Sequence, residues 1–185
     1  MDQAKWYALW VSTGDELETV RELNRKGARC SWIYPTYVQR KKYGGQWHDV
    51  VKPMFPGYVF FTGNSVGLGQ AITAATKFAR ILTDGKEPMP LAPTEVEFIK
   101  KVTVAKQGEE FAAGDVNSPE VISLSAECSY GFIENDQVIV TRGPLRNQEA
   151  CIKKIDRHKR LATVEISMLG RPMTVDLSLE IVYKK

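Results

Sequence analysis

Residues 135–160, NDQVIVTRGPLRNQEACIKKIDRHKR, decide how the rest of the chain is interpreted. A short β-prone run at residues 138–140 is broken by Gly143-Pro144, and an apolar run resumes at Ala150. This pattern predicts a strand, a tight turn and a second strand. The segment then ends in Arg157, His158, Lys159 and Arg160, all of which are basic. A small β module with such a turn is expected to bind a polyanion.

The distribution of charge agrees with this expectation, although the net charge is only +3. Residues 1–134 contain 15 Lys or Arg and 16 Asp or Glu, whereas residues 135–185 contain 10 and 6. The positive excess therefore lies in the C-terminal segment, as in nucleic-acid-binding modules. Charge alone fits a solvated surface turn equally well, and it does not separate RNA from DNA.

Composition narrows the class of protein further. The chain has 185 residues, 43% of them hydrophobic and 25% charged, which is typical of a globular protein with one large or two small domains. No apolar run approaches the roughly 20 residues of a membrane helix, and the N-terminus lacks the features of a secretory signal. The three cysteines, Cys30, Cys128 and Cys151, fit reduced thiols in the cytoplasm.

Nothing in the sequence indicates an enzyme. His48 and His158 have no metal-ligand spacing, and there is no Gly-rich phosphate loop and no nucleophile–His–acid arrangement. We therefore expect no catalytic residue, no metal and no cofactor.

Residues 1–106 are expected to form an α+β domain, an antiparallel sheet flanked by helices. Leu68, Ile72 and Ala75 would face inward from the second helix. A Gly/Pro loop is expected over residues 83–93. The expected strands are 5–11, a hairpin of 31–42 and 47–51, 58–61 and 81–82, and the expected helices are 15–26, 65–80 and 95–106.

A linker and a second domain follow. Residues 107–120 are small, polar and acidic, so the linker is assigned to 107–129 and the second domain to 130–185. A short strand at 121–124 leads into it. Its strands are close together and predict a small β-barrel; they are expected at 137–142, 148–155, 161–167, 172–177 and 179–183.

Five motifs in order resemble the NusG family of transcription elongation factors over nearly the whole chain. They are WY at 6–7, FPGYV at 55–59, DGKEPMPL at 84–91, the KOW motif within 136–150, and SMLGR at 167–171. The family usually has Gly where this chain has Ala150, which would be strained if the site requires a positive φ. Residues 152–162, IKKIDRHKRLA, are most similar to LoaP, a specialised branch of antiterminators.

The resemblance implies that the N-terminal domain binds the clamp helices of RNA polymerase through an apolar patch. The patch would contain Trp10, Phe55, Tyr58 and Phe60. Because strand residues alternate, either Tyr58 and Phe60 or Val59 and Phe61 face outward; we favour the first pair, although core positions explain the same run. The chain is expected to be a monomer. The basic residues at the expected hairpin tip make upstream DNA a further candidate partner. The residues expected to contact it are Arg40, Lys41 and Lys42, which fit a solvated loop equally well.

The LoaP-like segment implies that the KOW domain binds an RNA hairpin in a leader transcript, which promotes read-through of terminators in long operons. Among the candidates, Arg157, Lys159 and Arg160 are favoured, and Lys153 and Lys154 are expected on opposite faces of a strand. The full set is Arg142, Arg146, Lys153, Lys154, Arg157, His158, Lys159, Arg160 and Arg171.

Two alternatives stay open at this point. One is a general NusG-type elongation factor that couples polymerase to the ribosome or to Rho. Met168 and Leu169 lie where the family binds a small-subunit ribosomal protein or Rho, but the same residues could be barrel core. The other is a ribosome-associated protein, because KOW modules also occur in ribosomal proteins; the FPGYV motif argues against it.

Overall fold

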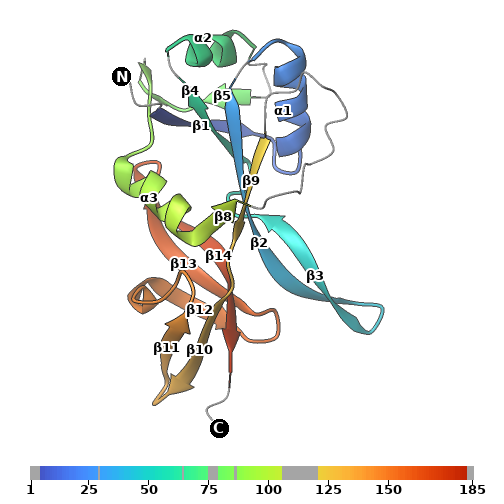
Figure 1. The fold of residues 1–185 in the computed structure, drawn as a ribbon, viewed down its shortest axis with the longest axis vertical. Helices are drawn as coiled ribbons and strands as arrows, with labels where there is room; N and C mark the ends of the chain where they lie inside the picture. Colours follow the sequence, from blue (N-terminus) through green and yellow to red (C-terminus); the bar gives the residue numbers. More distant parts are fainter. Residues whose placement is uncertain are drawn as a thin grey trace. The chain divides into compact units, whose positions relative to one another are not determined.

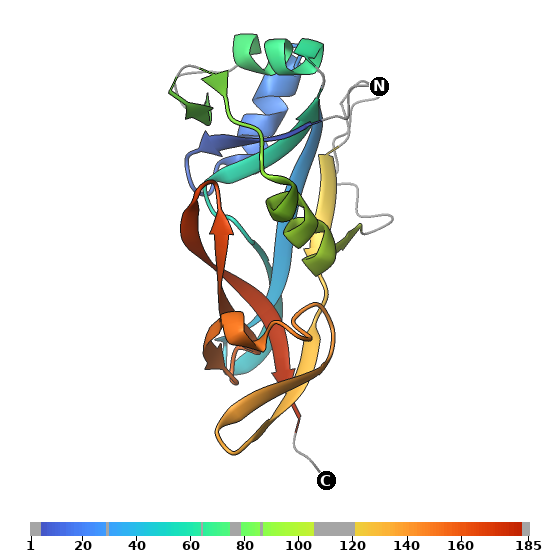
Figure 2. The same cartoon turned by 90° about the vertical axis from the view of Figure 1, so that its left-hand side faces the viewer.

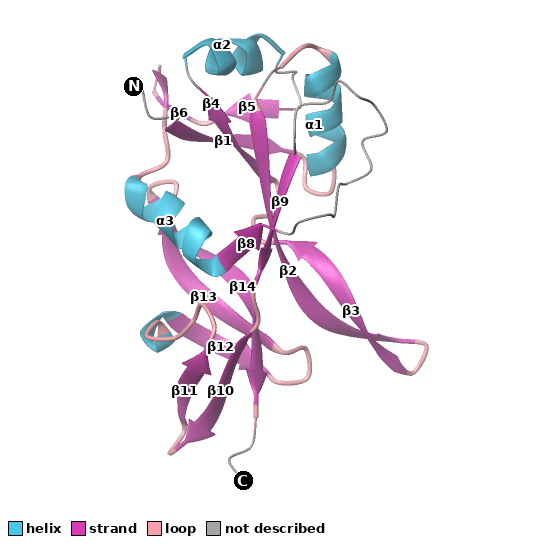
Figure 3. Cartoon of the chain, in the orientation of Figure 1, coloured by secondary structure: helices cyan, strands magenta, loops and turns pink. Residues whose placement is uncertain are grey.

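The computed structural model describes residues 5–28, 30–63, 65–74, 79–85, 87–105 and 121–182. The chain divides into two compact units. Unit 1 contains Met1–Tyr34, Phe55–Val96 and Ala105–Ser123; unit 2 contains Pro35–Met54, Glu97–Val104 and Leu124–Lys185. Strands and a few short helices make up both (Figure 3), which confirms the α+β class. None of the helices in the described ranges is long and apolar enough to cross a membrane.

The sheet of unit 1 is built around β1 (Lys5–Val11), which lies between β4 (Tyr58–Gly63) and β5 (Ala79–Ile81). All these pairs are antiparallel, and β4 also pairs with the first residues of β2 (Ser31–Tyr43). The helices α1 (Glu16–Arg25) and α2 (Ser65–Ala74) lie next to this sheet (Figure 1). The aromatic and β-branched residues of β1 and β4 fit such a pleated, half-buried surface.

One face of this sheet packs against α1 and α2. Tyr7 and Phe61 stack there with ring centroids 5.5 Å apart, and Val20 and Leu23 reach the same cluster from α1. Since Cβ atoms alternate along a strand, Trp10, Tyr58 and Phe60 lie on the opposite face. The register agrees, because Trp10 pairs with Tyr58 and Ala8 pairs with Phe60. Tyr58 and Phe60 therefore share the face opposite Val59 and Phe61, as predicted, but this face does not point outward at Phe60, which is fully buried.

A buried carboxylate, Glu16, holds the FPGYV turn. Its two oxygens accept hydrogen bonds from the backbone N–H of Gly14 and of Gly57, each at 2.9 Å. Gly57 has a φ of +81°, which explains why glycine occupies that turn. Burial, followed by the charge of Glu16, raises the pKa of Tyr34 to about 12. Because Glu16 lies in the first turn of α1, it also joins the start of that helix to the FPGYV turn.

Replacing Glu16 by Gln is expected to lower the free energy of unfolding by about 2 kcal/mol, because one buried N–H loses its charged acceptor. Chemical denaturation followed by circular dichroism measures the change. The matched control is Glu18→Gln on the same helix, an exposed residue that pairs with Arg21 and Arg25, for which a change below about 0.5 kcal/mol is expected. Equal losses in the two variants would contradict this role for Glu16.

Some predicted elements of the N-terminal half have different bounds. The helix expected over 65–80 is α2, which ends at Ala74, and Ile72 is exposed although it was expected inward. Ala75 lies outside the described residues. The loop at 83–93 contains β6 (Thr83–Asp84) and β7 (Glu87–Pro88). The third helix, α3 (Pro93–Val102), is followed by the strand β8 (Thr103–Ala105) rather than continuing to residue 106.

The C-terminal part of unit 2 is a five-stranded sheet. Its strands are β10 (Ser129–Glu134), β11 (Gln137–Arg142), β12 (Ile152–Asp156), β13 (Leu161–Met168) and β14 (Arg171–Ile181). The order is β11-β10-β14-β13-β12, with β10 and β14 parallel and the other neighbours antiparallel (Figure 2). Among the described strands, β11 and β12 are not paired with each other; the side chain of Glu149 instead accepts a hydrogen bond from Val140 N–H at 3.2 Å.

Two predictions for this sheet are corrected. The strand expected at 148–155 begins as a 3₁₀ turn, η1 (Glu149–Cys151), and only then becomes β12. The two strands expected at 172–177 and 179–183 are the single strand β14, which pairs with β13 along most of its length. Ala150 lies in η1 without a positive φ; Asn147, at φ +62°, has the left-handed conformation instead. The strain considered for Ala150 is therefore absent.

Unit 2 also contains the hairpin formed by the end of β2 and by β3 (Gln46–Pro53), which was predicted from the sequence. Gly44 and Gly45 form its turn with φ +57° and +80°, a conformation that favours glycine. β9 (Val121–Ala126) follows β2 in the strand order. The compact units thus group this hairpin with the C-terminal strands, a division different from boundaries at 106 and 130. Residues 107–120 of the expected linker lie outside the described residues.

Candidate nucleic-acid interface

The basic turn at residues 157–160 joins β12 to β13. Asp156 shapes it, because its side chain accepts a hydrogen bond from the backbone N–H of Lys159 at 2.9 Å. That hydrogen bond is the main reason why the pKa of Asp156 lies below its usual value. At the end of the turn Arg160 has a φ of +55°, and its carbonyl accepts from Leu179 N–H at 2.9 Å. The turn is therefore held at both ends.

Ion pairs separate the basic residues of this region into two groups. Lys159 pairs with Asp156 at 3.4 Å, Arg160 with Glu180 at 3.2 Å, and Lys153 with Glu165 at 3.0 Å. Within the described ranges, Arg157 and Lys154 have no ion pair and are exposed. Of the three favoured residues, Arg157 is thus the most available for a ligand.

The other predicted RNA contacts are more widely spread. The guanidinium of Arg142 lies 4.8 Å from the ring centroid of Tyr130, while Arg146, His158 and Arg171 are exposed. A register shift between Ile152 and Lys154 interrupts the regular alternation of β12, and both Lys153 and Lys154 are exposed. Because residues on opposite faces of a strand can both be exposed, the expected opposite orientation of these two lysines stays a prediction.

Arg40, Lys41 and Lys42 lie near the tip of the β2–β3 hairpin, as predicted, with Lys41 and Lys42 exposed. The structure brings this basic segment to the basic turn, because the backbone N–H of Arg40 donates to the carbonyl of Lys159 at 3.1 Å. Sequence reasoning missed this neighbourhood, since the two segments are more than 100 residues apart and no local pattern links them.

Three side chains hold the hairpin on β14. Ser178 donates its hydroxyl to the carbonyl of Val38 at 2.6 Å, and the hydroxyl of Tyr37 lies 3.5 Å from a carboxylate oxygen of Asp176. The other Asp176 oxygen accepts from the hydroxyl of Thr163 at 2.7 Å. Burial, followed by the charge of Asp176, raises the pKa of Tyr37 to about 12, so the phenol stays protonated at neutral pH.

The predicted polymerase-binding residues differ in exposure. Trp10 is 43% exposed, and its cross-strand partner Tyr58 is partly buried. Phe55 and Phe60 are buried at 1% and 0% exposure, and their rings meet edge to face at 5.1 Å. The expectation that Phe60 is exposed is therefore wrong: its face of β4 was predicted correctly, but that part of the face is covered.

Met168 and Leu169 also differ in burial. Met168 is fully buried, so of the two possibilities left open for it, partner contact and barrel core, the structure supports the core. Leu169 is partly buried in the turn between β13 and β14, with a φ of +56°. Within the described residues, no group of three or more His, Cys, Asp or Glu side chains could hold a metal ion.

Comparisons with known proteins agree with the motifs. A family model described as "Transcription termination factor nusG" matches residues 4–100, more than half of the chain. The transcription termination/antitermination proteins NusG of Staphylococcus aureus strain Mu50 and of Staphylococcus epidermidis strain ATCC 35984 are each 25% identical over 191 residues, covering 97% of this chain and 95% of the relative.

A solved structure titled "Domain interaction in Thermotoga maritima NusG" is similar with 17% identity and a TM-score of 0.48, covering 97% of this chain and 94% of that chain. Three findings lead to one conclusion: the motifs occur in the order of the family, the fold is α+β, and the family model matches residues 4–100. The chain belongs to the NusG family, whose members are transcription factors and not enzymes, as the sequence led us to expect.

Proposed function

We propose that the chain is a LoaP-like antitermination factor that binds RNA polymerase through residues 1–106 and a leader RNA hairpin through the KOW domain at 130–185. It would promote read-through of terminators in long operons, in the cytoplasm where polymerase acts. The RNA part of this proposal rests mainly on the turn at 157–160. Asp156 orients the backbone of this turn by its hydrogen bond to Lys159 N–H. Arg157 is exposed there and has no ion pair among the described residues.

This geometry suits RNA better than a general surface role. A-form RNA has a deep, narrow major groove that side chains enter mainly where a bulge or loop widens it. A compact turn with an exposed guanidinium fits such a place, because Arg makes bidentate hydrogen bonds to phosphate or to a guanine edge.

The polymerase part rests on family membership and on the Trp10–Tyr58 pair. These two residues are cross-strand neighbours on one face of the sheet, and Trp10 is exposed. Tyr and Trp are frequent hot spots in protein interfaces. We assign them as the polymerase contact, with the clamp helices as the partner that the family suggests.

The RNA part is tested by measuring the affinity of the full chain for a synthetic RNA stem-loop across a range of salt concentrations. Log K should fall linearly with log salt, and Arg157→Ala should weaken binding and reduce the slope by about 1. Arg25→Ala removes the same charge from the exposed surface of α1 and should leave binding unchanged. An affinity that does not respond to salt would rule out phosphate contacts and with them this proposal.

The second candidate is a general NusG-type elongation factor that couples polymerase to a ribosomal protein or to Rho. Leu169, partly exposed at the turn after β13, is the residue that favours it. The buried position of Met168 argues for the first candidate, since one of the two expected contact residues belongs to the core.

A further inference from the structure

The tip of the β2–β3 hairpin has an unusual surface. Tyr43 and Trp47 are 52% and 39% exposed, although large aromatic side chains are normally covered. Each has a polar neighbour: the Tyr43 ring stacks on His48 at 3.9 Å and 11°, and the Arg40 guanidinium lies 5.3 Å from the Trp47 ring centroid. Each ring therefore has one neighbouring side chain while part of its surface remains exposed.

Cations flank the rings on both sides of the hairpin. Lys42 is the cross-strand partner of Trp47, and Lys41 is the partner of His48. In a pleated hairpin, consecutive pairs point to opposite faces, so each face combines an aromatic ring with a lysine. Pro35–Met54 contains four Lys or Arg and one Asp, which makes the whole hairpin cationic.

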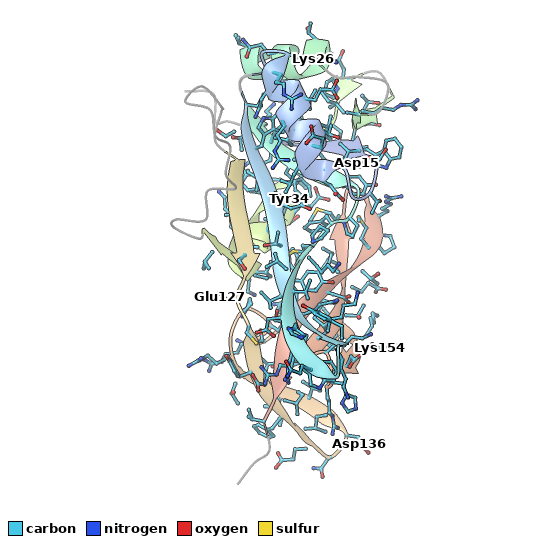
Figure 4. The ribbon with its side chains drawn as sticks, turned by 90° about the vertical axis from the view of Figure 1, so that its right-hand side faces the viewer. Asp15, Lys26, Tyr34, Glu127, Asp136 and Lys154 are labelled. Atoms are coloured by element: carbon cyan, nitrogen blue, oxygen red, sulfur yellow. The ribbon has the colours of Figure 1, made fainter. Side chains whose placement is uncertain are left out.

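The hairpin and the basic turn belong to one compact unit. Besides the Arg40–Lys159 hydrogen bond, Ser178 and Asp176 of β14 contact Val38 and Tyr37 of the hairpin. Figure 4 faces this side of the chain and shows the hairpin, in cyan, in front of β13 and β14, in red. The turn at 157–160 and the hairpin are thus held side by side within unit 2.

Exposed aromatic rings beside cations are suited to one class of ligand, a nucleic acid with unpaired bases. Unpaired bases stack on aromatic side chains, whereas the bases of a duplex are already stacked on one another. Lysines beside the rings would neutralise the adjoining phosphates. A stem-loop RNA supplies both features, because its stem presents phosphates and its loop presents unstacked bases.

We propose that the hairpin face carrying Lys42 and Trp47 forms one RNA-binding surface with the turn at 157–160. The stem phosphates lie on the turn and on Lys42, and an unpaired loop base stacks on Trp47. This inference rests on the proposed RNA-binding function and extends it to a segment outside the KOW motif.

The test measures binding of the full chain by fluorescence anisotropy to a synthetic RNA stem-loop and to the same stem as a blunt duplex. Trp47→Ala should weaken stem-loop binding about tenfold, since stacking of a base contributes about 1–3 kcal/mol, and should change duplex binding little. Trp47→Phe should restore most of the affinity. Lys42→Ala should reduce the salt slope by about 1 for the stem-loop. Val51→Ala, an exposed residue on the same hairpin, is the matched control.

The outcomes separate this inference from the proposed function. If Arg157→Ala weakens binding while Trp47→Ala and Lys42→Ala do not, the KOW turn binds RNA alone and the extended surface is wrong. If all three variants bind as the wild type does, neither the basic turn nor the hairpin contacts RNA, and both proposed contact surfaces are wrong. Equal losses of Trp47→Ala on the stem-loop, the blunt duplex and duplex DNA would overturn base stacking, as would failure of Trp47→Phe to restore affinity.

Discussion

Gly143→Ala is expected to destabilise the C-terminal sheet by roughly 3–5 kcal/mol, because two unfavourable effects coincide there. Gly143 has a φ of +98°, which residues with a Cβ rarely adopt. A Cβ on this backbone would also lie 2.6 Å from the Cα of Ser129 and 2.8 Å from the carbonyl oxygen of Cys128. These neighbours are backbone atoms and cannot rotate away, so the strands must shift.

The displacement of Ser129 should also weaken the contacts that this residue makes. Its hydroxyl accepts a hydrogen bond from Leu145 N–H at 3.1 Å, and it starts β10 opposite Leu179. Urea denaturation followed by circular dichroism measures the loss. Gly170→Ala is the matched control: its φ is +71°, but apart from Gly170 and its two chain neighbours no heavy atom of the described residues lies within 4 Å of the added Cβ, so only about 1 kcal/mol of backbone strain is expected. If the two variants lose equal stability, the steric explanation is wrong.

Phe60→Ala should lower the free energy of unfolding by about 3–5 kcal/mol, which is typical of removing a large buried aromatic side chain. Phe60 is completely buried and packs on Phe55. Any loss of polymerase binding in this variant would therefore come from loss of structure. Thermal and denaturant unfolding of the full chain test the prediction directly.

Trp10→Ala is the companion variant, because Trp10 lies on the same face and is exposed. It should lose far less stability than Phe60→Ala and should still weaken binding to purified RNA polymerase if the proposed contact is correct. A stability loss below about 1 kcal/mol for Phe60→Ala would mean that Phe60 is accessible in solution, as the alternation pattern alone suggests.

Local patterns in the sequence were sufficient for most secondary structure. The helix at α1 follows from apolar residues at helical spacing with acidic residues first and basic residues last. The β2–β3 hairpin follows from two β-prone runs around Gly44-Gly45. The face of β4 follows from strict alternation. Each of these features depends only on residues close together in the chain.

Exposure was harder to predict. Alternation places Phe60 on the face opposite Phe61, but it does not say whether that face is covered at Phe60 and open at Trp10. Met168 shows the same limit, since a motif position does not reveal whether its side chain is in the core. Burial depends on which distant segments pack at each point, and the sequence of a single strand does not contain that information.

The sequence by itself determined the NusG-type motifs, the α+β class and the basic character of residues 157–160. Only the tertiary structure decided which basic residues are paired with carboxylates, that Glu16 holds the FPGYV turn, and that the hairpin cations lie beside the basic turn. The physical reason is distance along the chain. Hydrophobic period and turn chemistry act within about ten residues, whereas ion pairs and hydrogen bonds such as Arg40–Lys159 form only after remote segments have packed.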